Sequence, residues 1–148
     1  MSGKQAYLTP QKICLSLNHW RTLRAEAERL APQEACGLLL GYCQTSHFQV
    51  VEVKPIENIL ESPTRYQMNP EQQIQVFNEM EARNLQLVGI YHSHPGGPEY
   101  PSATDVDEAY YPETVYIILS PSGEDWQAQG FLIRENQFIP VKIEIVRA

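Results

Sequence analysis

The sequence has no apolar run long enough to cross a membrane and few cysteines for a disulfide framework. No hydrophobic stretch approaches the roughly 18 residues of a membrane-spanning helix, and residues 1–10 contain no apolar signal-peptide core. The three cysteines, Cys14, Cys36 and Cys43, are odd in number and have no short paired spacing. This pattern agrees with a reducing compartment. We therefore expect a cytoplasmic protein whose cysteines are small buried apolar residues.

Positive charge is also scarce. Eleven Lys and Arg stand against 18 Asp and Glu, which gives a net charge of −7, and the basic residues are scattered along the chain. Nucleic-acid binders usually carry a clustered basic face, so we expect neither a nucleic-acid nor a membrane partner. A chain of 148 residues without an internal repeat is most simply one domain, residues 1–148.

Apolar periodicity and Pro/Gly punctuation predict strands alternating with helices. A helix is expected at about residues 19–30, capped by Ser16 or Asn18, and a second at 70–83, capped by Asn69. The second helix is expected to bury one stripe, made of Ile74, Phe77 and Met80. Strands are expected at residues 12–17, 36–42, 48–54, 85–90, 114–120, 126–134 and 137–146. This order favours an α/β (α+β) fold in which helices flank a sheet.

Two histidines follow the apolar run at residues 85–90, and they are the first candidates for chemistry. Alternate residues of a strand share a face, so His92 and His94 can present two imidazoles side by side. Asp105 follows within one helical turn of Ser102, after an irregular Pro/Gly segment at residues 95–101. Two imidazoles and one carboxylate leave a coordination position open, which is the pattern of a catalytic zinc site.

Each half of this pattern also has an ordinary interpretation. An isolated His-x-His at a strand end is most often a pair of polar residues at an edge. The sequence from Ser102 to Asp105 is a common helix-start signal, in which serine caps the helix and an acid complements its dipole. The conjunction of the two halves favours the metal site, and capping and ligation are compatible.

With these residues in place, the sequence resembles the JAMM (MPN-plus) zinc metallopeptidases. Their signature is His-x-His, seven residues, then Ser-x-x-Asp, and residues 92–105 match it without a gap. The family also has a glutamate before an apolar strand, and Glu34 occupies that position within residues 33–41. The resemblance extends over nearly the whole chain and implies a minimal, stand-alone bacterial-type member. It implies a single MPN-like domain with a mixed β-sheet flanked by helices, in cytidine-deaminase-like layering.

The resemblance implies a role for each motif residue. His92, His94 and Asp105 are expected to hold one Zn²⁺, with water as the fourth ligand. Glu34 is the expected general base, a choice that physical reasoning alone does not make among 18 acids. Ser102 is expected to stabilise the oxyanion.

Other polar residues near the motif are expected to stand outside the site. Asp107 and Glu108 compete with Glu34 by position but should face solvent, and Glu99 is the remaining competitor. His19, near a helix start, and His47, in a hairpin turn, are expected to be solvated rather than functional.

The implied substrate is the C-terminal Gly-Gly tail of a ubiquitin-like or sulfur-carrier protein, cleaved at a peptide or isopeptide bond, in the setting of cysteine or sulfur metabolism. The chain lacks the long insertions of eukaryotic deubiquitinating members, which favours a sulfur carrier. Two alternatives keep the same fold: a non-catalytic MPN scaffold that binds ubiquitin-like proteins, and a deubiquitinase-like protease with another substrate. A non-haem iron oxygenase would order its ligands differently. A zinc base deaminase would need a Pro-Cys-x-x-Cys pair, which is absent.

Overall fold

The computed structural model describes residues 7–147 and contains seven strands and three helices in that part of the chain. Residues 1–6 of the amino-terminal segment lie outside the described residues. None of the described helices is long and apolar enough to cross a membrane. The elements are β1 (Lys12–Ser16), α1 (Leu17–Leu30), β2 (Cys36–Cys43), β3 (His47–Ile56), α2 (Pro70–Ala82), β4 (Gln86–Ser93), α3 (Ala103–Asp107), β5 (Val115–Ser122), β6 (Asp125–Arg134) and β7 (Gln137–Val146).

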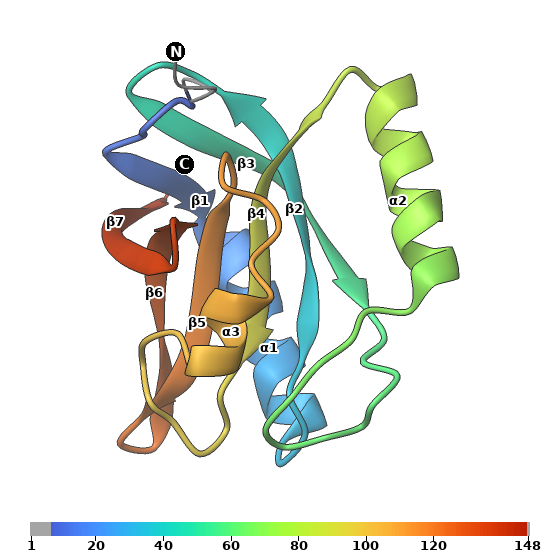
Figure 1. Ribbon diagram of the computed structural model, residues 1–148, viewed down its shortest axis with the longest axis vertical. Coiled ribbons are helices and arrows are strands. Elements are labelled where there is room, and N and C mark those ends of the chain that lie inside the picture. The colour runs from blue at the N-terminus through green and yellow to red at the C-terminus, as the bar shows by residue number, and fades with distance from the viewer. Residues whose placement is uncertain (1–6, 148) are drawn as a thin grey trace.

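The strands form one mixed sheet that closes on itself (Figure 1), in the order β1-β3-β2-β4-β5-β6-β7. Closure comes from β1, which pairs in parallel with both β3 and β7. The central pair β4 and β5 is also parallel, and the other neighbours are antiparallel. The mixed α+β composition expected from the sequence is confirmed, but the sheet is a barrel rather than an open layer. The cytidine-deaminase-like layering stays a prediction.

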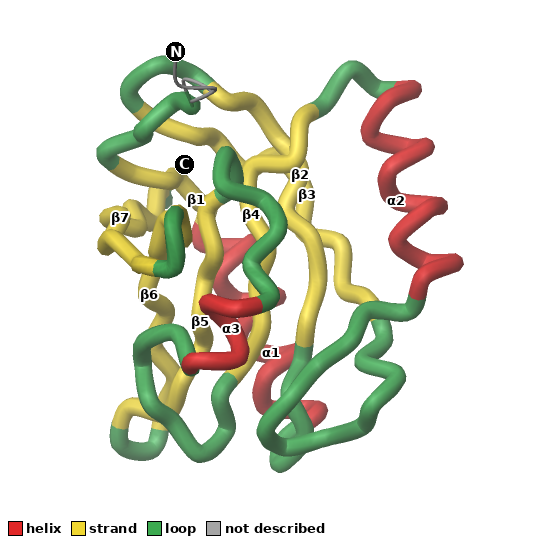
Figure 2. Tube along the Cα trace, in the orientation of Figure 1, coloured by secondary structure: helices red, strands yellow, loops and turns green. Residues whose placement is uncertain are grey.

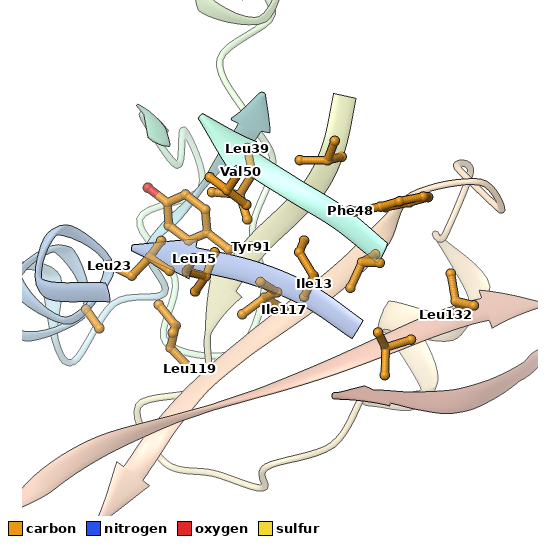
Figure 3. Packing of buried hydrophobic residues seen from close by; sticks show 14 residues of the cluster. Ile13, Leu15, Leu23, Leu39, Phe48, Val50, Tyr91, Ile117, Leu119 and Leu132 are labelled. Carbon is orange, nitrogen blue, oxygen red and sulfur yellow. The ribbon is translucent and has the colours of Figure 1, made fainter. Parts of the chain in front are cut away.

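Two apolar clusters lie on the two faces of the sheet. In β5, Val115, Ile117 and Leu119 join the first cluster, whereas Tyr116 and Ile118 join the second, as the two-residue period of a strand requires. Both faces of β5 are therefore buried, as its continuous apolar run predicts. Figure 3 shows side chains from β1 to β5 of the first cluster converging with Leu23 of α1. The second cluster lies on the side where α2 and α3 cover the sheet.

The helix ends follow local capping rules. Ser16 caps α1, and the ring of the half-buried His19 accepts the Ser16 backbone N–H at 3.1 Å, so His19 takes part in the helix cap and not in the candidate site. Asn69 caps α2 with Pro70 at the first position, as predicted. However, Ile74 is 60% exposed, and Val76 packs beside Phe77 instead. The predicted stripe is therefore wrong at Ile74 but holds at Phe77, because α2 lies on the outside of the barrel against β3 and β4 and buries no residue completely.

Two long loops lie at the end of the molecule where β4 ends (Figure 2). One, residues 57–69, joins β3 to α2, and the other, residues 94–102, joins β4 to α3. An ion pair between Arg65 and Glu108, 3.6 Å apart, connects the first loop to the end of α3. The loops bring together groups that are distant in the sequence.

Candidate metal centre

His92 and His94 stand where β4 leaves the sheet. His92 lies opposite Cys36 of β2 and Ile118 of β5, and the backbone N–H of His94 donates to Leu119 O at 2.7 Å. Both imidazoles face the same side, as expected for residues two apart in an extended chain, and their Nε2 atoms are 3.0 Å apart. His92 is 1% exposed and His94 is 5% exposed, so the pair is buried.

Asp105 reaches the histidines from α3. Its Oδ2 lies 3.1 Å from His92 Nε2 and 3.0 Å from His94 Nε2. The start of α3 fixes this geometry through a reciprocal capping box: Asp105 N–H donates to Ser102 Oγ at 3.0 Å, and Ser102 N–H donates to Asp105 Oδ2 at 2.9 Å. Burial acts to raise the pKa of Asp105, but the two imidazoles beside its carboxylate outweigh burial and hold that pKa well below its usual range.

The three converging atoms have too few protons to join them all by hydrogen bonds. His94 Nδ1 lies 2.8 Å from Pro98 O. A carbonyl only accepts, so Nδ1 carries the proton and the Nε2 of a neutral His94 is a bare lone pair. That lone pair and the Asp105 carboxylate are both acceptors, and one Nε2 proton on His92 can serve only one of them. A cation among the three atoms would satisfy every lone pair.

The spacing of these atoms also suits zinc. A tetrahedral site with bonds of about 2.0–2.1 Å separates its ligand atoms by roughly 3.3–3.4 Å, within a few tenths of an ångström of the 3.0–3.1 Å found here. Among the described residues, His92, His94 and Asp105 form a group whose ligand atoms all lie within 4.8 Å of one another, close enough to bind one ion. Two imidazoles with one carboxylate are the ligands of zinc sites that keep a position open for chemistry.

Glu34 lies in the turn between α1 and β2 and is 3% exposed. Its backbone is fixed at both ends, because Glu34 N–H donates to Ser62 O at 2.8 Å and Glu34 O accepts from Asn58 Nδ2 at 3.1 Å. Its side-chain Oε1 is buried and has no hydrogen-bond partner in the described chain. Burial raises the pKa of Glu34 to about 8, with His94 lowering it and Asp105 raising it further. An unpaired carboxyl group with a pKa close to neutrality is suited to exchanging protons.

Three residues that were not singled out in the sequence help to assemble the centre. Ser93 Oγ accepts from Ala35 N–H at 2.7 Å and Ser93 N–H donates to Ala35 O at 2.9 Å, which ties the histidine strand to the residue after Glu34. The Asn58 side chain makes four hydrogen bonds that shape the 57–69 loop. Tyr66 stacks on His92, with ring centroids 4.6 Å apart and planes at 24°. No spacing in the sequence signals these contacts, except that Ser93 is the middle residue of His-x-His.

The other polar residues considered in the sequence have no part in this cluster. Glu99, Asp107 and Glu108 are exposed, which confirms the prediction for Asp107 and Glu108. His47 is half-buried at the start of β3, with its Nδ1 3.3 Å from Ser46 Oγ.

The three cysteines are free thiols. Cys14 and Cys36 are buried, as predicted, whereas Cys43 is half-buried. Burial raises the pKa of Cys36 to about 12, so this thiol is protonated and unreactive near neutral pH.

Two cavities open beside the centre. The first, about 490 Å³, lies between the 57–69 loop, α3 and the outer face of β2 and β4, and its lining includes Tyr66, Ile90, Asp105 and Glu108. The second, about 390 Å³, lies between the end of α1 and the start of the 57–69 loop, and Glu34 and Asn58 are among its lining residues. One cavity therefore reaches Asp105, and the other reaches Glu34.

Residues 16–131 match the family of prokaryotic homologs of the JAB domain. A probable TtuB-protein conjugate cleaving protease from Thermus thermophilus is 34% identical over 121 residues, which are 81% of this chain and 75% of that protein. A CysO-cysteine peptidase from Mycobacterium tuberculosis is 38% identical over 96 residues, 65% of this chain and 64% of that protein. A solution structure of a Desulfitobacterium hafniense protein superposes with a TM-score of 0.83 at 30% identity and covers 92% of this chain and 94% of that one.

Proposed function

The chain belongs to the family of prokaryotic homologs of the JAB domain, and from this we propose that it is a zinc-dependent peptidase acting after the C-terminal Gly-Gly of a ubiquitin-like or sulfur-carrier protein. The family match confirms the resemblance noted in the sequence. We treat residues 1–148 as one JAMM/MPN-plus metallopeptidase domain, with His92, His94 and Asp105 as metal ligands and Glu34 and Ser102 as catalytic residues. The relatives support cleavage of conjugates, because their names specify a TtuB-protein conjugate and a CysO-cysteine bond.

The single observation that carries the proposal is the convergence of two imidazole Nε2 atoms and a carboxylate beside the buried, unpaired Glu34. Zn²⁺ held by these ligands would acidify a water molecule and polarise the scissile carbonyl. A nearby positive charge also favours the ionised form of a buried carboxyl group, which would convert Glu34 into an acceptor. A scaffold that only binds a partner has no need to bury an unpaired carboxyl group at this cost.

Glu34 and Ser102 divide the proton transfers and the charge stabilisation in this proposal. Glu34 takes the proton of the attacking water and delivers it to the leaving amine, so both must come within hydrogen-bond reach of its carboxyl oxygens. The Ser102 Oγ lone pair is used by Asp105 N–H, which leaves its own hydrogen free to donate to the developing oxyanion. The first cavity has room for an extended tail, and glycines without side chains suit a narrow approach to the reacting carbonyl.

Mass spectrometry of defined substrates tests the proposal. The zinc-loaded protein is incubated with a sulfur-carrier protein whose Gly-Gly end is joined to a lysine side chain, to a single cysteine or to a linear peptide. Glu34→Gln is the matched control because it keeps all three proposed ligands and removes the base. Cleavage after the second glycine by wild type alone supports the proposal.

A second control replaces the carrier's Gly-Gly by Ala-Ala. If the Ala-Ala substrate is cleaved equally well, the assignment to Gly-Gly tails is wrong. If the zinc-loaded wild type cleaves none of the three substrates, the sulfur-carrier assignment fails and the scaffold alternative gains weight.

A further inference from the structure

The two histidines differ in the contacts of Nδ1, the ring nitrogen that does not face the other candidate ligands. His94 Nδ1 is fixed by Pro98 O at 2.8 Å, the usual arrangement in which the second nitrogen of a ligating histidine is oriented by a hydrogen bond. His92 Nδ1 is buried and has no hydrogen-bond partner in the described chain. The orientation of the His92 ring must therefore come from another contact.

We propose that Tyr66 is a positioning residue that holds the His92 imidazole in its metal-binding orientation by ring stacking. Tyr66 lies against His92 with ring centroids 4.6 Å apart and planes inclined by 24°. A stacked neighbour restricts rotation of the imidazole about its Cβ–Cγ bond, which is the motion that an Nδ1 hydrogen bond would otherwise restrict. This inference rests on the metal site of the proposed function.

The 57–69 loop holds Tyr66 in place through its two neighbours. Asn58 Nδ2 donates to Arg65 O at 3.1 Å, and Gln67 N–H donates to Asn58 Oδ1 at 3.1 Å. The same Asn58 amide group donates to Glu34 O at 3.1 Å. One side chain thus places both the stacking partner of His92 and the backbone of Glu34.

The stacking makes the order of the 57–69 loop part of the metal affinity. Tyr66 also lines the 490 Å³ cavity, so a chain bound there would lie beside the residue that stacks on His92. By linkage, whatever steadies Tyr66 strengthens metal binding, and bound metal steadies Tyr66 in return.

Metal affinity measured without substrate tests this role. Zinc is titrated into metal-free wild type, Tyr66→Phe and Tyr66→Ala against a chromophoric chelator, and the Co²⁺ absorption spectrum of each protein reports the ligand geometry. Tyr66→Phe keeps the stack and should bind zinc within about twofold of wild type. Tyr66→Ala should weaken zinc binding by roughly 10-fold, the low end of the loss for removing such supporting contacts, and should alter the Co²⁺ spectrum.

Tyr111→Ala is the matched control, because Tyr111 packs against the same apolar cluster and lines the same cavity. It should keep wild-type zinc affinity. Tyr66→Leu retains apolar volume without a ring, and it replaces Tyr66→Ala in the comparison if the alanine variant does not fold.

Three results would overturn the inference: wild-type affinity in Tyr66→Ala or Tyr66→Leu, equal losses in Tyr66→Phe and Tyr66→Ala, or an equal loss in Tyr111→Ala. If wild type binds no zinc at all, both the proposed function and this inference fail. If wild type binds zinc and the Tyr66 variants bind it equally well, only this inference fails.

Discussion

Ser102 has two roles in the proposed mechanism, and substitutions at this position can distinguish them. Its Oγ accepts Asp105 N–H at 3.0 Å and so caps α3, the short helix that carries a proposed metal ligand. Its hydroxyl hydrogen is free to stabilise the oxyanion. Loss of a serine cap to alanine costs about 1 kcal/mol, equivalent to roughly a fivefold change in an equilibrium. Loss of an oxyanion donor costs about 10²–10³ in kcat.

Ser102→Ala and Ser102→Gly both remove the hydroxyl, but glycine is nearly as good an N-cap as serine and alanine is not. The Ser102 backbone N–H that donates to Asp105 Oδ2 at 2.9 Å survives in both variants. We therefore expect both to retain zinc, to lose about 10²–10³ in kcat, and to differ from each other by no more than about fivefold.

The assay combines zinc content by elemental analysis with single-turnover cleavage of the Gly-Gly substrate. Ser102→Thr, which keeps both the cap and the hydroxyl, is the rescue control. Near wild-type turnover in Ser102→Gly together with a large loss in Ser102→Ala would show that Ser102 only caps α3. Zinc loss in Ser102→Ala would refute the separation of its two roles.

Three further predictions address the metal, the buried acid and the packing. His94→Ala should abolish stoichiometric zinc binding in calorimetric titrations whereas His47→Ala should not, and equal binding in both variants would remove His94 from the ligand set. In the metal-free protein the pKa of Glu34 is raised from 4.5 to about 8. As the pH rises from about 4.5 to about 8, wild type should therefore lose up to about 4–5 kcal/mol of stability relative to Glu34→Gln. The reason is that the carboxyl group loses its proton at a lower pH in the unfolded state than in the folded state. Urea-unfolding midpoints of the two proteins that run parallel across this pH range would contradict the prediction. Gly41→Ala places a Cβ in steric conflict with the backbone oxygen of Gln49, so it should lower the free energy of unfolding by about 1–3 kcal/mol or more. An unchanged thermal midpoint would be inconsistent with the close approach of β2 and β3.

The predictions that the structure confirms follow short-range rules. A cap needs only Ser102 and the amide of Asp105, three residues on, and the alternation of a strand needs only His92 and His94. The α2 start at Asn69 and Pro70 and the buried run of β5 follow from equally local patterns. The prediction for Ile74 was wrong because it assumed that one face of α2 is fully buried. The position of this helix depends instead on the loop that precedes it and on the strands it contacts.

Residue types at fixed short spacings were enough to indicate the family, the candidate ligands and most of the elements. Other features became visible only in the folded chain: β1 closes the barrel against β7, Ser62 and Asn58 hold the backbone of Glu34, and Tyr66 stacks on His92. These features arise between segments far apart in the chain. Such contacts depend on how the whole chain packs. They have no fixed spacing in the sequence from which they could be predicted.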